Sequence, residues 1–223
     1  MNDLFIYQHL GLGDHIVCNG LIRELAKQHN KTCLLVKEKN FISVSNMFKD
    51  LNLSYVVAKD DAAADFFIRT NSPQNMFKIG HEKLDLKKNF DRSFYEESGV
   101  DFEKRWSSWH IERDLNREQQ LFNHFQLKEN EYVFVHHDSR FQINPAYLPQ
   151  GVPLLAPNPE VTSNIFDYLT ILEKAKEIHC IASTFMFIID SIKTCDKIVV
   201  HRYMRTGPTW CEPTLKREWK ILQ

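Results

Sequence analysis

The sequence predicts an α/β protein with two halves, each built around a parallel sheet. Short apolar runs alternate with helix-like runs through the first 80 residues. A charged, aromatic stretch without convincing strands follows, and strand-like runs return after residue 131. Alternating β and α elements favour parallel sheets with helices on both faces. At 223 residues, 43% of them hydrophobic, the chain has room for one large domain or two small ones.

The first half alternates strands and helices in order. Strands are expected at 4–9, 32–37, 54–58 and 75–79, and helices at 16–28, 41–51 and 62–69. Ile16, Leu21 and Leu25 recur at helical spacing. Asp60 and Asp61 precede the third helix and are suited to capping it.

The middle of the chain predicts a helical connector over residues 82–128. Leu115, Leu121, Phe122 and Phe125 give its last helix an apolar stripe. We therefore expect an N-terminal domain over 1–128, which includes this connector, and a C-terminal domain over 129–223.

The second half repeats the βα pattern. Strands are expected at 132–137, 152–156, 178–182 and 197–201, with helices inside 162–177 and 183–193. Thr162 and Ser163 are candidate N-caps. Residues 141–159 are rich in proline and predict a long loop, and Pro213 predicts the start of a short terminal helix.

Composition excludes several classes of protein. The net charge of −1 gives no basic excess, so we expect no nucleic-acid partner. The N-terminus lacks the pattern of a signal peptide, and no apolar run approaches the ~20 residues of a spanning helix. The five cysteines are scattered, without a C-x-x-C pair. We expect a soluble cytoplasmic protein, with peripheral membrane contact and oligomeric state left open.

The turn after the first strand holds Gly11, Gly13, Asp14 and His15. Glycines there let a ligand approach the backbone closely, so Gly11 and Gly13 are candidates for binding the phosphate or sugar of a donor. The G-x-G-x-x-G dinucleotide motif is incomplete, and Asp14 would place a negative charge beside a pyrophosphate. A carboxylate at this edge of an α/β sheet can instead take a proton from a substrate hydroxyl, or cap the helix, and the two roles are compatible. His15 is a substitute base or an acceptor contact.

The segment "HLGLGDHIVCNGLIREL" resembles the opening of glycosyltransferases with the two-Rossmann-domain (GT-B) fold, in particular the heptosyltransferase type. In that family the acid of the turn is the proposed general base, and this resemblance assigns that role to Asp14. A proline that is usual early in the first helix is replaced here around Asn19 and Gly20.

A second segment carries the residues expected to hold an anion. Ser183 and Thr184 follow a strand and open a helix, where hydroxyls, free N–H groups and the helix dipole converge; simple capping is the alternative. The segment resembles the donor-binding part of GT-B enzymes, most closely α1,6- and O-fucosyltransferases. That resemblance implies a pyrophosphate-gripping arginine, for which Arg140 is the candidate, and favours a guanosine diphosphate sugar.

Metal and acceptor contacts are less well marked. His136 and His137 are adjacent in a strand and point to opposite faces, so we expect no metal site and no cofactor. Arg105 and Trp109 are candidates for binding an acceptor, although helix packing between the domains is the stronger interpretation.

These resemblances imply a compact GT-B architecture with two Rossmann-like domains facing a cleft. The implied activity is metal-independent transfer of a hexosyl or related sugar from a nucleoside-diphosphate sugar to a glycan or other hydroxyl acceptor. Direct displacement with inversion is expected, and retention stays open. The alternatives are a non-catalytic nucleotide- or glycan-binding relative, and a Rossmann-type nucleotide-sugar oxidoreductase or epimerase.

Overall fold

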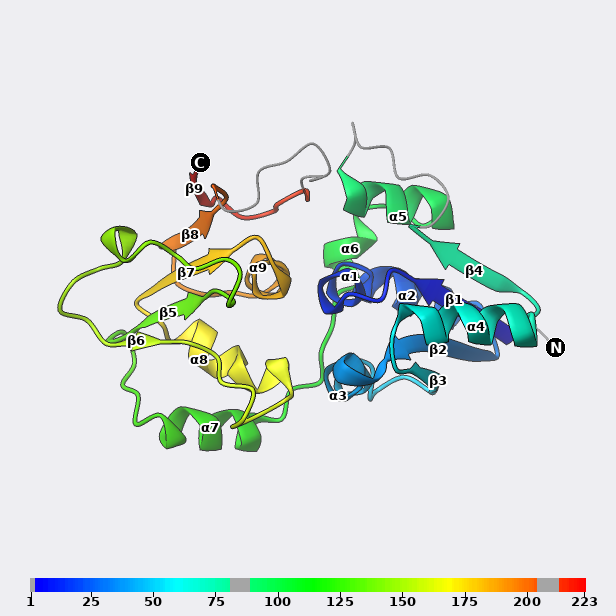
Figure 1. The fold of residues 1–223 in the computed structure, drawn as a ribbon, viewed down its shortest axis with the longest axis horizontal. Coiled ribbons are helices and arrows are strands. Elements are labelled where there is room, and N and C mark those ends of the chain that lie inside the picture. The colour runs from blue at the N-terminus through cyan, green and yellow to red at the C-terminus, as the bar shows by residue number, and fades with distance from the viewer. Residues whose placement is uncertain (1–2, 81–88, 204–212) are drawn as a thin grey trace. The chain divides into compact units, whose positions relative to one another are not determined.

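The computed structural model describes residues 3–80, 89–203 and 213–223. These residues group into two compact units (Figure 1). Residues 3–80 and 89–112, joined by 213–214, form the first unit; residues 113–203 and 215–223 form the second. The chain therefore changes unit at Glu112–Arg113, whereas the sequence predicted a domain boundary after residue 128.

The first unit contains a four-stranded parallel sheet in the order β3-β2-β1-β4. Its strands are β1 (Asp3–Gln8), β2 (Lys31–Lys37), β3 (Leu53–Ala58) and β4 (Met76–Ile79). All four lie where the apolar runs predicted them. An apolar cluster that includes Phe5, Leu35 and Ile68 packs the sheet against α4 (Asp61–Asn71).

The other helices of this unit are short. They are α1 (Leu12–Val17), α2 (Asn19–Lys27), the 3-10 turn η1 (Glu38–Asn40), α3 (Phe41–Met47), α5 (Phe90–Ser98) and α6 (Lys104–Ser107). The single helix expected over 16–28 is two helices, because Cys18, with ψ of 6°, interrupts the turn between α1 and α2. Asp60 caps α4 as predicted, since its carboxylate accepts a 2.9 Å hydrogen bond from the Ala63 N–H.

Asn19 and Gly20, where the sequence departs from the heptosyltransferase pattern, dock α2 onto α6 and the segment after it. The Asn19 side chain accepts from the His110 N–H and donates to the His110 carbonyl at 3.0 and 3.1 Å. A Cβ at Gly20 would lie 1.9 Å from the Lys104 carbonyl oxygen. A side chain at position 20 is therefore excluded by backbone contact.

The second unit contains a five-stranded parallel sheet in the order β6-β5-β7-β8-β9. Its strands are β5 (Val133–His136), β6 (Leu154–Leu155), β7 (Glu177–Ile181), β8 (Ile198–His201) and β9 (Lys220–Leu222). The first four lie inside or next to the expected ranges. The terminal helix expected from Pro213 is wrong, because residues 213–219 form no helix and β9 pairs with β8 instead.

The helices of the second unit are α7 (Leu115–His124), α8 (Leu169–Glu173) and α9 (Thr184–Ser191), with 3-10 turns η2 (Pro145–Tyr147) and η3 (Ile165–Tyr168). Helix α7 belongs here rather than to an N-terminal domain: the buried Glu118 carboxylate accepts from the Thr170 N–H at 3.0 Å and from its hydroxyl at 2.7 Å. Asn164, not Thr162 or Ser163, caps η3. Within the described residues, no helix is both long and apolar enough to cross a membrane.

Candidate functional site

A pocket of about 390 Å³ opens at the carboxyl edge of the first unit's sheet. Ligands of open α/β sheets bind at this edge, and the volume falls within the range of about 300–1,000 Å³ of ligand pockets. Eight residues line it: Tyr7, His9, Leu10, Gly11, Asp14, Lys37, Asp61 and Asp65. Gly11 and Asp14 are the predicted site residues among them.

Asp14 occupies the third position of α1, whose N-cap is Gly11. The backbone N–H groups of Asp14 and His15 donate to the Gly11 carbonyl at 3.1 and 3.2 Å, which fixes the first turn. Asp14 is therefore not the N-cap residue, although its charge suits the positive end of the helix dipole. Burial raises its pKa to about 6, and His9, the Gly11 backbone and Lys37 limit the rise.

Gly11 leaves room for that carboxylate. A Cβ at position 11 would lie 2.5 Å from the Asp14 Oδ2. The backbone at Gly11 has φ of −71° and ψ of 143°, which other residues adopt easily, so space rather than backbone freedom favours glycine. Gly13 lies inside α1, outside the residues that line the pocket in the described part of the chain.

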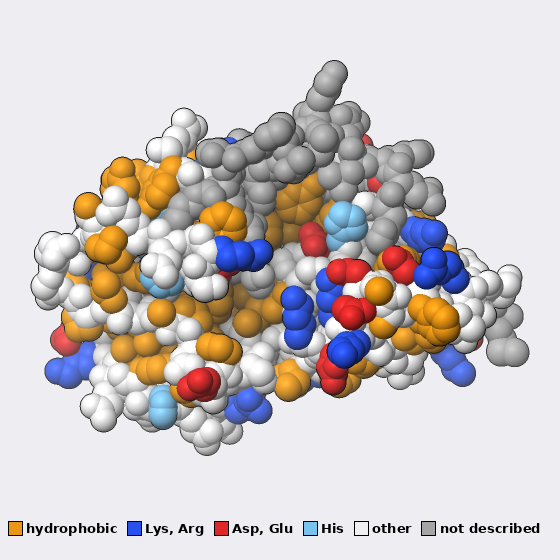
Figure 2. Space-filling model, viewed as in Figure 1, with side chains coloured by type: hydrophobic (Ala, Val, Ile, Leu, Met, Phe, Trp, Pro, Cys, Tyr) orange, Lys and Arg blue, Asp and Glu red, His pale blue; other side chains and the backbone are white. Residues whose placement is uncertain are grey.

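The other walls of the pocket come from strand ends and α4. The Tyr7 hydroxyl donates to Asp65 at 2.6 Å, and the Lys37 ammonium pairs with Asp61 at 2.7 Å. The His9 ring packs edge-on against Phe94, with ring centroids 5.7 Å apart. Figure 2 shows acidic and basic side chains close together near α4 on this face of the first unit.

His15 points into the interior. It is fully buried and its Nδ1 contacts the Gln8 side chain. Burial lowers the pKa of His15 to about 3, so the ring stays neutral near pH 7. No described group pairs with its Nε2. His15 shares the turn with Asp14 but is not among the residues that line the pocket.

Arg105, a candidate for binding an acceptor, is a core residue of the first unit. Only 2% of its surface is exposed, and its guanidinium pairs with the buried Asp91 and donates to the Thr214 carbonyl at 2.6 Å. The guanidinium also lies 4.9 Å from the Trp106 ring. Trp109 is partly buried, with an indole N–H that has no partner among the described residues.

In the second unit, Ser183 and His136 meet at the carboxyl ends of β7 and β5. The Ser183 hydroxyl is hydrogen-bonded to the His136 Nδ1 at 2.8 Å rather than to the first turn of α9, of which Ser183 is the N-cap and Thr184 the first residue. Arg140 lies in the loop after β5, with its side chain 74% exposed and 3.6 Å from Asp138. The structure thus brings Ser183, Thr184 and His136 together, while the described contacts of Arg140 are local.

The sequence did not indicate five polar residues that line the pocket: Tyr7, His9, Lys37, Asp61 and Asp65. Part of the signal was available, since Tyr7, His9 and Lys37 lie at or just after the ends of β1 and β2, and these ends share one edge in a parallel sheet. Asp61 and Asp65 instead lie on α4, which follows β3. The sequence does not show which of these residues lie close together in space, because partners such as Tyr7 and Asp65 are 58 residues apart in the chain.

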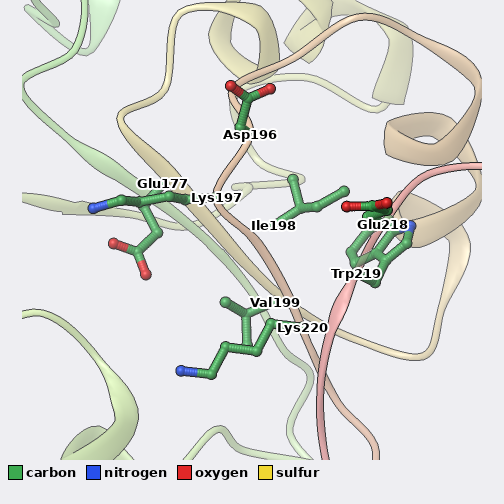
Figure 3. A pocket seen from close by; sticks show the side chains of 8 residues that line it. All are labelled: Glu177, Asp196, Lys197, Ile198, Val199, Glu218, Trp219 and Lys220. Carbon is green, nitrogen blue, oxygen red and sulfur yellow. The ribbon is translucent and has the colours of Figure 1, made fainter.

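A second hollow lies at the opposite edge of the second unit's sheet, among the starts of β7, β8 and β9 (Figure 3). Its charged side chains, which include Glu177, Lys197 and Lys220, spread apart rather than converge on one point (Figure 3). Across the described ranges, no group of three or more His, Cys, Asp or Glu side chains is arranged to hold a metal ion.

No protein-family model and no curated protein matches this sequence. Solved structures do match it. A family 9 glycosyltransferase from Veillonella parvula matches with a TM-score of 0.64 and 10% identity over 99% of this chain and 86% of its own. The iron-containing dodecameric glycosyltransferase TibC from enterotoxigenic E. coli matches with a TM-score of 0.56 and 11% identity over 95% of this chain.

The same TibC protein, solved as a heptosyltransferase in complex with ADP-D-beta-D-heptose, matches with a TM-score of 0.53 and 11% identity over 84% of this chain. This chain spans 61% and 55% of the two TibC chains. At such identities the likeness concerns the fold. It confirms the predicted fold class, an α/β protein with parallel sheets of the kind found in GT-B glycosyltransferases.

Proposed function

We propose that this chain transfers a sugar from a nucleoside-diphosphate sugar to a hydroxyl acceptor, with Asp14 as the general base. The observation that carries the proposal is the place of Asp14: a largely desolvated carboxyl group in a pocket at the carboxyl edge of a parallel sheet. The fold shared with two glycosyltransferases supports the reaction class.

The pKa of Asp14 suits the task. A carboxyl group with a pKa of about 6 is mostly ionised at pH 7, yet it accepts a proton more readily than an ordinary carboxylate. The acceptor hydroxyl oxygen forms a bond to the anomeric carbon while the bond from that carbon to the diphosphate oxygen breaks. The hydroxyl proton passes to Asp14, and the nucleoside diphosphate leaves with the bonding electrons. This displacement inverts the anomeric centre.

For the donor we propose the second unit, through Ser183 and Thr184 with His136 beside them. The Ser183 hydroxyl and the backbone N–H groups at the start of α9 suit a diphosphate, and such contacts require no metal. The TibC structure contains an ADP-sugar, whereas the fucosyltransferase-like segment favours a guanosine diphosphate sugar. The base of the donor is therefore the first thing to determine.

The experiment compares Asp14→Asn with Asp101→Asn, the same chemical change at an exposed site outside the pocket. Thermal unfolding against ADP, GDP, UDP, CMP, dTDP and NAD identifies the nucleotide; a ligand at one hundred times its Kd stabilises the fold by about 2.7 kcal/mol. Release of that nucleotide from the corresponding nucleotide sugars is then measured. We expect Asp14→Asn to lower the rate roughly 10²–10⁴-fold with nucleotide binding unchanged, and Asp101→Asn to have no effect.

Two results would contradict the proposal. Stabilisation by NAD alone would favour the oxidoreductase or epimerase alternative. Binding of a nucleoside diphosphate without any transfer by the wild-type protein would favour a non-catalytic relative, an alternative consistent with the short span of this chain on TibC.

A further inference from the structure

The Asp14 pocket has an uneven balance of charge. Three carboxylates line it, Asp14, Asp61 and Asp65, against the Lys37 ammonium and the His9 ring. The Lys37 ammonium is already paired with Asp61 at 2.7 Å. The described partner of Asp65 is the neutral Tyr7 hydroxyl, which leaves the charge of Asp65 in place.

Helix α4 presents two of these carboxylates to the pocket at some cost to itself. Asp61 and Asp65 are four residues apart, so they share one face of the helix, where like charges are destabilising. Each carboxylate is bound by a residue of the sheet. Asp61 forms an ion pair with Lys37 on β2, and Asp65 accepts a hydrogen bond from Tyr7 on β1. The Tyr7 hydroxyl donates its hydrogen bond to the Oδ1 atom of Asp65.

This arrangement discriminates between kinds of ligand. A carboxylate accepts hydrogen bonds from sugar hydroxyls, and charge-assisted bonds of this type are about twice as strong as neutral ones. A phosphate or carboxylate group on the ligand would instead be repelled by Asp14, which is largely desolvated, and by Asp65, which is exposed.

Resting on the proposed function, we propose that the acceptor presents to this pocket a hydroxyl-bearing sugar without phosphate or carboxylate groups, and that Asp65, oriented by Tyr7, selects it. Asp65 binds a hydroxyl of that sugar while Asp14 faces the hydroxyl that reacts. The pocket thus sets the class of acceptor as well as holding the base.

The experiment measures binding, so it requires no turnover. Glucose, mannose and galactose are each compared with their 6-phosphates and their uronic acids by ligand-observed NMR on the wild-type protein. We expect at least one neutral hexose to bind, and its anionic counterparts to bind about tenfold more weakly. Asp65→Asn should weaken binding of the neutral sugar and reduce its advantage in affinity over the anionic sugars to about threefold.

Tyr7→Phe tests the effect of the Tyr7 hydroxyl separately from the effect of the carboxylate charges. It leaves every carboxylate in place, so the discrimination should persist while the neutral sugar binds more weakly. Anionic sugars that bind as well as neutral ones, or no neutral hexose that binds, would overturn the proposal. So would Tyr7→Phe narrowing the discrimination as much as Asp65→Asn. A wild-type protein that discriminates but transfers no sugar would contradict the proposed function alone.

Discussion

At the scale of single residues, Asp14 and His15 show how strongly burial decides chemical role. Adjacent residues of a helix point about 100° apart, and here one side chain enters the pocket while the other enters the core. Burial favours the neutral form of both, so it raises the pKa of Asp14 to about 6 and lowers that of His15 to about 3. The two shifts have opposite consequences for stability.

The direction in which each group changes stability with pH follows from the difference in proton binding between the folded and the unfolded chain. Folded Asp14 holds its proton more tightly than the unfolded chain does, so its contribution to stability increases as the pH falls from above 6 toward 4. Folded His15 binds a proton less tightly than the unfolded chain, so its contribution decreases as the pH falls below about 6.5. Mild acid therefore makes the contribution of Asp14 to stability more favourable and that of His15 less favourable.

Gly11→Ala tests whether space beside Asp14 matters. The new Cβ would meet the Asp14 Oδ2, so the carboxylate must move, while the backbone at position 11 tolerates alanine. We expect transfer to slow by about tenfold or more with stability unchanged within about 0.5 kcal/mol. Initial rates and urea unfolding check both parts. An unchanged rate would mean that the carboxylate position seen here is not the reacting one.

At the scale of elements, a few close contacts hold the short helices and the last strand. The buried Asp190 carboxylate on α9 accepts from the backbone N–H groups of Lys216 and Arg217 and from the Trp219 indole. These contacts fix residues 216–219 directly before β9. Because the partners lie 26–29 residues from Asp190, no local pattern distinguishes this strand from the short helix expected after Pro213.

Gly20→Ala tests the contact between α2 and α6. The added Cβ would lie 1.9 Å from the Lys104 carbonyl oxygen and 2.8 Å from its carbonyl carbon, so backbone must shift. We expect a loss of about 3 kcal/mol in the free energy of unfolding, measured in urea. Gly99→Ala is the matched control: Gly99 has φ of +65° with open space around it, and its loss should be about 1 kcal/mol. Equal losses would contradict the contact.

At the scale of the whole molecule, the chain forms two units that each contain one parallel sheet, with described residues 3–80, 89–112 and 213–214 in the first and 113–203 and 215–223 in the second. Buried parallel strands are continuous apolar runs, which is why all strands except β9 could be predicted from the sequence. The boundary could not, since the apolar stripe of α7 is the same whichever unit it joins. The Glu118–Thr170 contact decides it.

The site could be predicted in part for the same reason. Asp14 is marked by the glycines before it and by its place after β1, and the structure keeps it at the strand ends. Arg105 carried no comparable signal: its buried partner Asp91 and the Thr214 backbone are 14 and 109 residues away, and only the folded chain joins them. The predicted roles of Ser183, Thr184 and Arg140 in donor binding stay predictions.

The most direct measurement is the titration of the Asp14 carboxyl group, followed by carbon NMR in the free protein with Asp14→Asn to assign the signal. We expect an inflection near pH 6, because burial dominates over the nearby His9 and Lys37. We also expect the rate of transfer to rise through the same pH. An inflection near the ordinary value of about 4 would show a solvated carboxylate and contradict Asp14 as a tuned base.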